Sequence, residues 1–104
     1  MQNPHQVYQR QSIMQASPAQ LVVKMYDLAI QATWNKDAPK VRNLLTTLIN
    51  GLDFDQPLSG DLFELYRYCQ DLTRNGELDQ VRELLEPLRE SWEEVARGQV
   101  GALS

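Results

Sequence analysis

Cysteine and histidine are nearly absent from this chain, which has one of each among its 104 residues. Cys69 therefore has no partner for a disulfide within the chain, and His5 alone excludes every metal site that needs two histidine ligands. Long apolar runs are missing too, so no segment approaches the roughly 20 apolar residues of a membrane-spanning helix. Met1 is not followed by a basic flank and an apolar stretch, so we expect no secretory signal and a cytoplasmic location.

Basic residues are scarce in the second half of the chain. The whole chain has ten Lys and Arg against fourteen Asp and Glu, a net charge of −4. Residues 1–52 carry five basic and two acidic residues, whereas residues 53–104 carry five basic and twelve acidic ones. Because an acidic surface repels phosphate backbones and anionic lipids, we expect neither nucleic-acid binding nor membrane insertion.

What the chain does contain is a set of helix start signals. Ser17, followed by Pro18 and by a Gln three residues on, is typical of a capping box. Asp37 before an Ala-Pro pair is a second expected N-cap, and Ser59 is a third. Strand signals are weak, because no stretch keeps a two-residue alternation rich in β-branched residues.

These signals predict one domain over residues 1–104, with all-α structure and no internal repeat. The predicted elements are a short helix within about 6–15 and long helices at about 18–35, 38–52, 60–74 and 77–97. Because the connections are short, we expect an antiparallel four-helix bundle with an additional short N-terminal helix. Residues 1–16 are expected to cover the bundle, and residues 98–104 to form a flexible tail.

The last two predicted helices contain two residues with specific expectations. Pro87 lies opposite the apolar stripe of its helix, so we expect a bend there and not a break. Cys69 falls on an apolar face, which predicts a buried and unreactive thiol.

The helix predicted at 18–35 is apolar around an unusually wide arc. One stripe is formed by Leu21, Met25, Leu28 and Ala32, and a second by Val22, Tyr26 and Ile30. Together they span about 240°, although one core-facing stripe needs little more than 100°. Either both sides are covered, one of them by the N-terminal segment, or part of the arc is a docking groove for another apolar helix. The two explanations are compatible if the segment can be displaced. The candidate docking residues are Tyr8, Ile13, Val22, Met25, Tyr26 and Ile30.

No group of residues indicates catalysis. A carboxylate-bridged di-metal bundle needs Glu-x-x-His pairs, and the chain has none. Glu90 and Glu94 are expected to be solvated surface charges, and Ser17 has no assignable general base. We therefore expect a protein that is not an enzyme and has no cofactor or metal.

Several short motifs follow one another in the order of a known family. They are Asn3-Pro4, Tyr8, Ser12-Ile13, Ala16-Ser17-Pro18, Leu21, Met25-Tyr26-Asp27, Leu48-Ile49, Leu52-Asp53, Leu62, Leu65, Tyr66, Tyr68, Leu84-Leu85, Leu88-Arg89-Glu90 and Trp92. In this order they resemble FliS, the flagellin-specific export chaperones. The Ala-Ser-Pro to Met-Tyr-Asp block is the most specific part, since any amphipathic helix supplies the leucine-rich parts.

The resemblance implies a cytoplasmic helical bundle without enzymatic activity. Members of this family bind the disordered C-terminal segment of newly made flagellin, block its premature polymerisation and present it to the flagellar export gate. The candidate docking residues would then bind the client, with export-gate components as further partners.

The chain also departs from that family. Its second and third helices are short, Leu28 replaces a small residue, and His5 replaces an aromatic one. These differences point to a compact or diverged paralogue, for which a different export substrate is an alternative. A second alternative is a structural or regulatory protein that uses the same apolar surface to form a homodimer.

Overall fold

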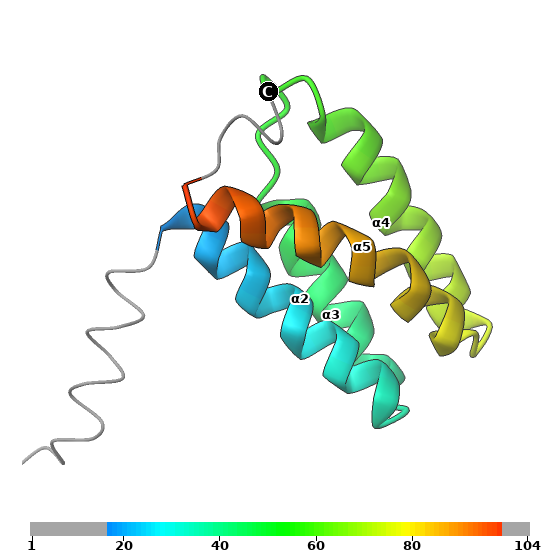
Figure 1. Cartoon of the computed structure of the whole chain (residues 1–104). Helices are drawn as coiled ribbons and strands as arrows, with labels where there is room; N and C mark the ends of the chain where they lie inside the picture. The colour runs from blue at the N-terminus through cyan, green and yellow to red at the C-terminus, as the bar shows by residue number, and fades with distance from the viewer. Residues whose placement is uncertain (1–16, 99–104) are drawn as a thin grey trace, which may run out of the picture.

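The computed structural model describes residues 17–98, which form four α-helices joined by short connections. The helices are α2 (Pro18–Trp34), α3 (Ala38–Asn50), α4 (Ser59–Arg74) and α5 (Leu78–Ala96). Figure 1 shows successive helices running antiparallel in one bundle. The predicted all-α four-helix bundle is confirmed, and its helix limits are correct to within two residues. The helix predicted within 6–15 lies outside the described residues, as does the predicted tail apart from Gly98.

The first two helix starts are capped as the sequence predicts. Ser17 Oγ accepts the backbone N–H of Gln20 at 3.2 Å, and Gln20 Oε1 accepts the N–H of Ser17 at 2.7 Å. Asp37 Oδ1 accepts the N–H of Lys40 at 3.2 Å at the start of α3. These bonds satisfy donors that a helix end would leave unpaired, which is why these residues mark the starts.

The prediction that Ser59 caps the third long helix is wrong. Ser59 is itself the first residue of α4, and Leu58 precedes it without a side-chain cap. The Ser59 hydroxyl instead donates to the backbone oxygen of Asp53 at 2.5 Å and is buried. Ser59 therefore closes the connection between α3 and α4.

Helix α5 is continuous through Pro87, so the prediction that this proline does not break the helix is confirmed. Pro87 is exposed, whereas Val81 and Leu85 on the opposite face are fully buried. The missing N–H of the proline therefore falls on the solvent side, where the carbonyl it would have bonded remains accessible to water.

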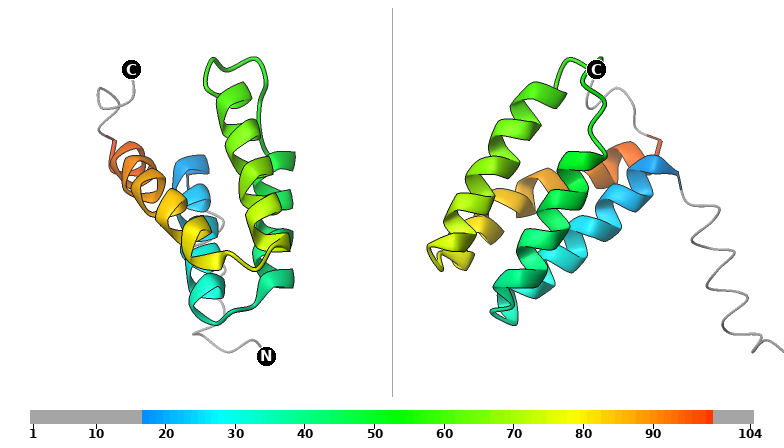
Figure 2. Two further views of the ribbon diagram at one scale, coloured as in Figure 1. Left: turned by 90° about the vertical axis from the view of Figure 1, so that its right-hand side faces the viewer. Right: turned by 180° about the vertical axis from the view of Figure 1, so that it is seen from behind.

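The helices pack as two layers, α2 against α5 and α3 against α4 (Figure 2). The core between the two layers consists of apolar and aromatic residues and contains no charged side chain among residues 17–98. It contains Tyr26, Ala29, Ala32, Val41, Leu45, Leu48, Tyr66, Cys69, Leu72, Leu78, Val81 and Leu85. Each helix contributes to this list, so the described residues share one core.

The prediction of no internal repeat is wrong, because the α4–α5 hairpin repeats the α2–α3 hairpin at a spacing of 40 residues. Residues 21–50 and 61–90 have nearly the same succession of buried, half-buried and exposed positions. Eight of the thirty pairs are identical: Tyr26/Tyr66, Thr33/Thr73, Asn35/Asn75, Val41/Val81, Arg42/Arg82, Leu44/Leu84, Leu45/Leu85 and Leu48/Leu88. With only eight identities, the repeat is hard to recognise in the sequence, because the two copies differ at most of their exposed positions.

The turns within the two hairpins have the same geometry. Lys36 and Gly76 both have positive φ angles, of 56° and 78°. The residue that follows each donates its N–H back across the turn at 2.9 Å, Asp37 to Ala32 and Glu77 to Leu72. This is the Schellman end of a helix, which needs a left-handed residue at that one position.

The two hairpins are arranged with approximate two-fold symmetry. Exchanging them maps the contact of α2 with α5 onto that of α4 with α3. The hydroxyls of Tyr26 and Tyr66 meet at 2.5 Å, as equivalent atoms near a two-fold axis do. The symmetry is only approximate, because α2 packs against α5 more extensively than α3 packs against α4. Helices α4 and α5 pack against each other least and diverge from the turn that joins them (Figures 1 and 2).

Candidate docking surface

Large apolar side chains remain exposed on α2, on α4 and in the α3–α4 connection. They are Leu21, Leu28, Trp34, Phe54, Leu58 and Tyr68, each at least 41% exposed. Leu28 and Tyr68, at 46% and 52%, occupy equivalent positions in the two hairpins. Because both side chains are about half exposed, neither is part of the buried core, and both add apolar area to the protein surface.

One edge of α2 faces α5. Arg89 of α5 donates to the carboxylate of Asp27, and the guanidinium carbon of Arg82 lies 3.5 Å from the centroid of the Trp34 ring. Leu21, Met25 and Leu28 lie on the other edge of α2 at helical spacing, and this edge therefore faces α3. On α3, Thr46 faces α4, and Leu44 lies on the opposite side of the helix, toward α2. We call the apolar line formed by Met25, Leu28 and Leu44 the α2–α3 seam.

The equivalent edge of α4 faces α5. Gln70 of α4 donates to Thr46 of α3 at 3.0 Å, which places the edge with Leu65 and Tyr68 on the opposite side, toward α5. On α5, Leu84 and Leu88 lie opposite the edge that carries Arg89. Leu65, Leu84 and Leu88 are half-buried and pack against the core. We call these three residues and Tyr68 the α4–α5 seam.

The structure places the described members of the six expected docking residues at different depths. Tyr26 is fully buried, and its side chain belongs to the core. Val22, Met25 and Ile30 are half-buried and pack against the core, and Tyr8 and Ile13 lie outside the described residues. Of the six, only Met25 lies on the α2–α3 seam. That the half-buried residues bind a client stays a prediction.

The residues of the α4–α5 seam were missed by the sequence reasoning. Leu65, Leu84 and Leu88 belong to stripes that a single core explains, so nothing in either helix alone singles them out. The sequence hint for this seam is Tyr68, an aromatic residue forty positions after Leu28, at the equivalent exposed position of the second hairpin.

The Tyr26 and Tyr66 hydroxyls satisfy each other in the core. Their rings meet edge to face, with centroids 6.3 Å apart and planes at 69°. Burial raises the pKa of both phenols, and the neighbouring Tyr66 adds to the effect on the Tyr26 pKa. Both groups therefore stay neutral, and the described residues contain no buried side-chain oxygen or nitrogen without a partner.

Cys69 is a buried free thiol, as the sequence predicts. Burial raises the pKa of this thiol to about 11. Its thiolate, which is the nucleophilic form, is therefore absent at neutral pH, and the residue packs as a small apolar group.

Stability should fall at alkaline pH because of Cys69. Above a pKa of about 9 the thiol ionises only in the unfolded chain, until the folded pKa of about 11 is reached. Over that interval we expect the free energy of unfolding to fall by about 1.4 kcal/mol for each pH unit from this residue. Urea unfolding between pH 8 and pH 10.5 measures the slope.

The Cys69→Ala variant is the control for that slope. It should lose the fall between about pH 9 and 10, and keep a steeper one at higher pH from Tyr26 and Tyr66, whose pKa values are also raised. An identical slope in both proteins would contradict the assignment.

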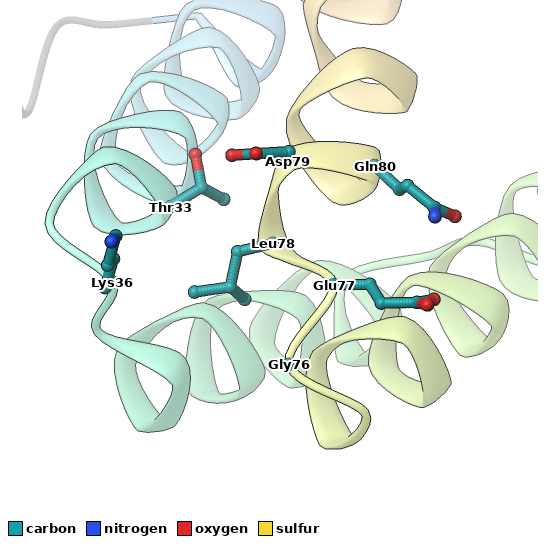
Figure 3. A pocket seen from close by; sticks show the side chains of 7 residues that line it. All are labelled: Thr33, Lys36, Gly76, Glu77, Leu78, Asp79 and Gln80. Carbon is teal, nitrogen blue, oxygen red and sulfur yellow. The ribbon is translucent and has the colours of Figure 1, made fainter.

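A cavity of about 470 Å³ opens where α2 ends and α5 begins. Its lining residues are Thr33, Lys36, Gly76, Glu77, Leu78, Asp79 and Gln80. Figure 3 shows that Asp79 points toward Thr33, whereas Glu77 and Gln80 point away from Thr33 and Lys36, so the polar side chains do not share one centre. Such a cavity offers no set of groups that could share one substrate or metal.

Within residues 17–98, no group of three or more His, Cys, Asp and Glu side chains is placed to hold a metal ion. No helix of this range is long and apolar enough to cross a membrane.

One comparison with known proteins gives a match. The family model described as "Flagellar protein FliS" matches residues 32–99, well over half of the chain. No curated protein and no solved structure matches. The matched range includes every residue of the α4–α5 seam. It excludes most of α2 and the N-terminal motifs up to Met25-Tyr26-Asp27.

Proposed function

This chain belongs to the FliS family and is therefore a flagellar export chaperone, and from this premise we propose that its client is the C-terminal segment of flagellin. The family match carries the proposal, because it covers three of the four helices. On this proposal the protein works in the cytoplasm, keeps flagellin from polymerising early and hands it to the export gate. The family is one of chaperones, and no catalytic step is part of the proposal.

The exposed apolar side chains supply the physical basis for holding such a client. A disordered segment binds by folding onto apolar surface, at an ordering cost of about 2–5 kcal/mol. Leu21, Leu28 and Tyr68 offer that surface without the bundle having to open. Val22, Met25 and Ile30 can add to it, since each is only half-buried.

Tyr8 and Ile13 enter the proposal as parts of a displaceable cover. With Val7 and Met14 they give residues 1–16 scattered apolar side chains, immediately before the exposed Leu21 of α2. On this proposal the segment shields apolar surface until flagellin takes its place. Shielding of this kind would limit self-association of the free chaperone.

Co-expression with flagellin tests the proposed client. We expect tagged chaperone to recover full-length flagellin as a one-to-one complex, and to recover flagellin without its C-terminal segment at a small fraction of that yield. Affinity capture followed by size-exclusion chromatography measures both. Equal recovery of the two flagellins, or of neither, would refute flagellin's C-terminal segment as the client.

A further inference from the structure

The two seams are equivalent in position but opposite in charge. Lys24 lies beside the α2–α3 seam, and Glu64 takes the equivalent place beside the α4–α5 seam. Asn43 of α3 is likewise matched by Glu83 of α5. Asp61 and Glu94 add further exposed carboxylates along the outer faces of α4 and α5, whereas Asp71 is paired with Arg74. The same apolar line is therefore bordered by a lysine in one hairpin and by carboxylates in the other.

The two seams also differ in how far they are closed. The α2–α3 pair packs along its length, whereas α4 and α5 diverge away from their turn (Figure 2). Leu88 is half-buried, whereas its counterpart Leu48 in α3 is buried; the other positions of the two seams have the same burial. Within residues 17–98, the α4–α5 seam is therefore less completely covered than the α2–α3 seam.

We propose that the α4–α5 seam binds a cationic amphipathic helix of the client, with the apolar stripe of that helix on the leucines and its Lys or Arg residues beside the carboxylates. This inference rests on the proposed function and names the segment chemistry that the chaperone selects. Opposite charge at the rim steers the encounter and rejects acidic helices, while apolar burial holds the complex. The lysine-bordered α2–α3 seam disfavours the same ligand.

Two model peptides test the charge selection on the full-length chain. Each has roughly 18 residues, about 27 Å as a helix and close to the length of α4, with leucines at helical spacing. One carries lysines at its other positions, and the other carries glutamates. Fluorescence anisotropy of labelled peptide should give about tenfold tighter binding for the lysine peptide, with a difference that shrinks between 50 and 300 mM salt. Equal affinity, or preference for the glutamate peptide, would overturn the proposal.

Substitutions at equivalent exposed positions then locate the site. Tyr68→Ser should weaken lysine-peptide binding by about tenfold, and Glu64→Lys by a similar factor. Lys24→Glu, at the position of α2 equivalent to Glu64, is the matched control and should change it less than about twofold. All three side chains are exposed, so the fold should survive, and circular dichroism checks this. Equal weakening by Lys24→Glu would place the site elsewhere and overturn the proposal.

The same variants keep this inference separable from the proposed client. If flagellin is captured but Tyr68→Ser and Glu64→Lys leave its capture unchanged, the client stands and the seam is wrong. If flagellin is not captured but the lysine peptide binds at α4 and α5 as described, the seam stands and the client is wrong.

Discussion

Replacing Leu85 by alanine is expected to lower the free energy of unfolding by about 2–5 kcal/mol. Leu85 is fully buried at the centre of α5, and its loss leaves a cavity among rigidly packed neighbours. A domain of this size has roughly 5–15 kcal/mol in total, so the variant should lose a large fraction of its stability. Urea unfolding followed by circular dichroism measures the change.

The internal repeat adds a second expectation to this experiment. Leu45 is the equivalent residue of α3 and is also fully buried, so Leu45→Ala should cost a similar amount. Leu28→Ala, at a position 46% exposed, is the control and should cost less than about 1 kcal/mol. Near-wild-type stability of Leu85→Ala would contradict the core described for the bundle.

Removing one hydroxyl from the buried tyrosine pair should cost about 1–3 kcal/mol, because it leaves the other hydroxyl unpaired in the core. This applies to Tyr26→Phe and to Tyr66→Phe, whose oxygens are 2.5 Å apart in the native protein. The double variant has two apolar rings and no orphaned group, so its cost should be smaller than the sum of the two. A double-mutant cycle by urea unfolding gives the coupling.

Tyr68→Phe provides the matched control for the cycle. It removes the same hydroxyl from an exposed ring, so it should change stability by less than about 0.5 kcal/mol. Strictly additive effects of Tyr26→Phe and Tyr66→Phe would mean that the two hydroxyls do not depend on each other for hydrogen bonding. The two-fold arrangement of the hairpins would then lose its central contact.

The buried tyrosine pair shows the limit of reasoning from one helix at a time. Judged from helical periodicity alone, Tyr26 is one of many apolar residues on α2, which has more apolar surface than one core needs, and it is therefore a candidate for docking. Its place in the core is set by Tyr66, forty residues away, and by the direction from which α4 approaches. Periodicity gives the angular position of a side chain around its helix, but not the neighbour at that angle.

The two apolar seams also could be predicted only in part from the sequence. The sequence indicates that α2 has more apolar surface than one core uses, and the exposure of Leu21 and Leu28 agrees. The exposed rim of α4 at Tyr68 depends on how far α4 and α5 diverge, which is a matter of helix packing. Packing angles follow from side chains meeting across two helices, so no single stretch of sequence encodes them.

Local interactions let the sequence by itself determine the helices, the starts at Ser17 and Asp37, the burial of Cys69 and the membership of a family of export chaperones. Those features depend on residues a few positions apart or on motifs in order, and both are visible along the chain. The tertiary structure decided the rest: the pairing of two equivalent hairpins, the use of Ser59 to close a connection, and the open seam between α4 and α5. Each of these depends on contacts between residues distant in the chain, whose geometry exists only once the helices have packed.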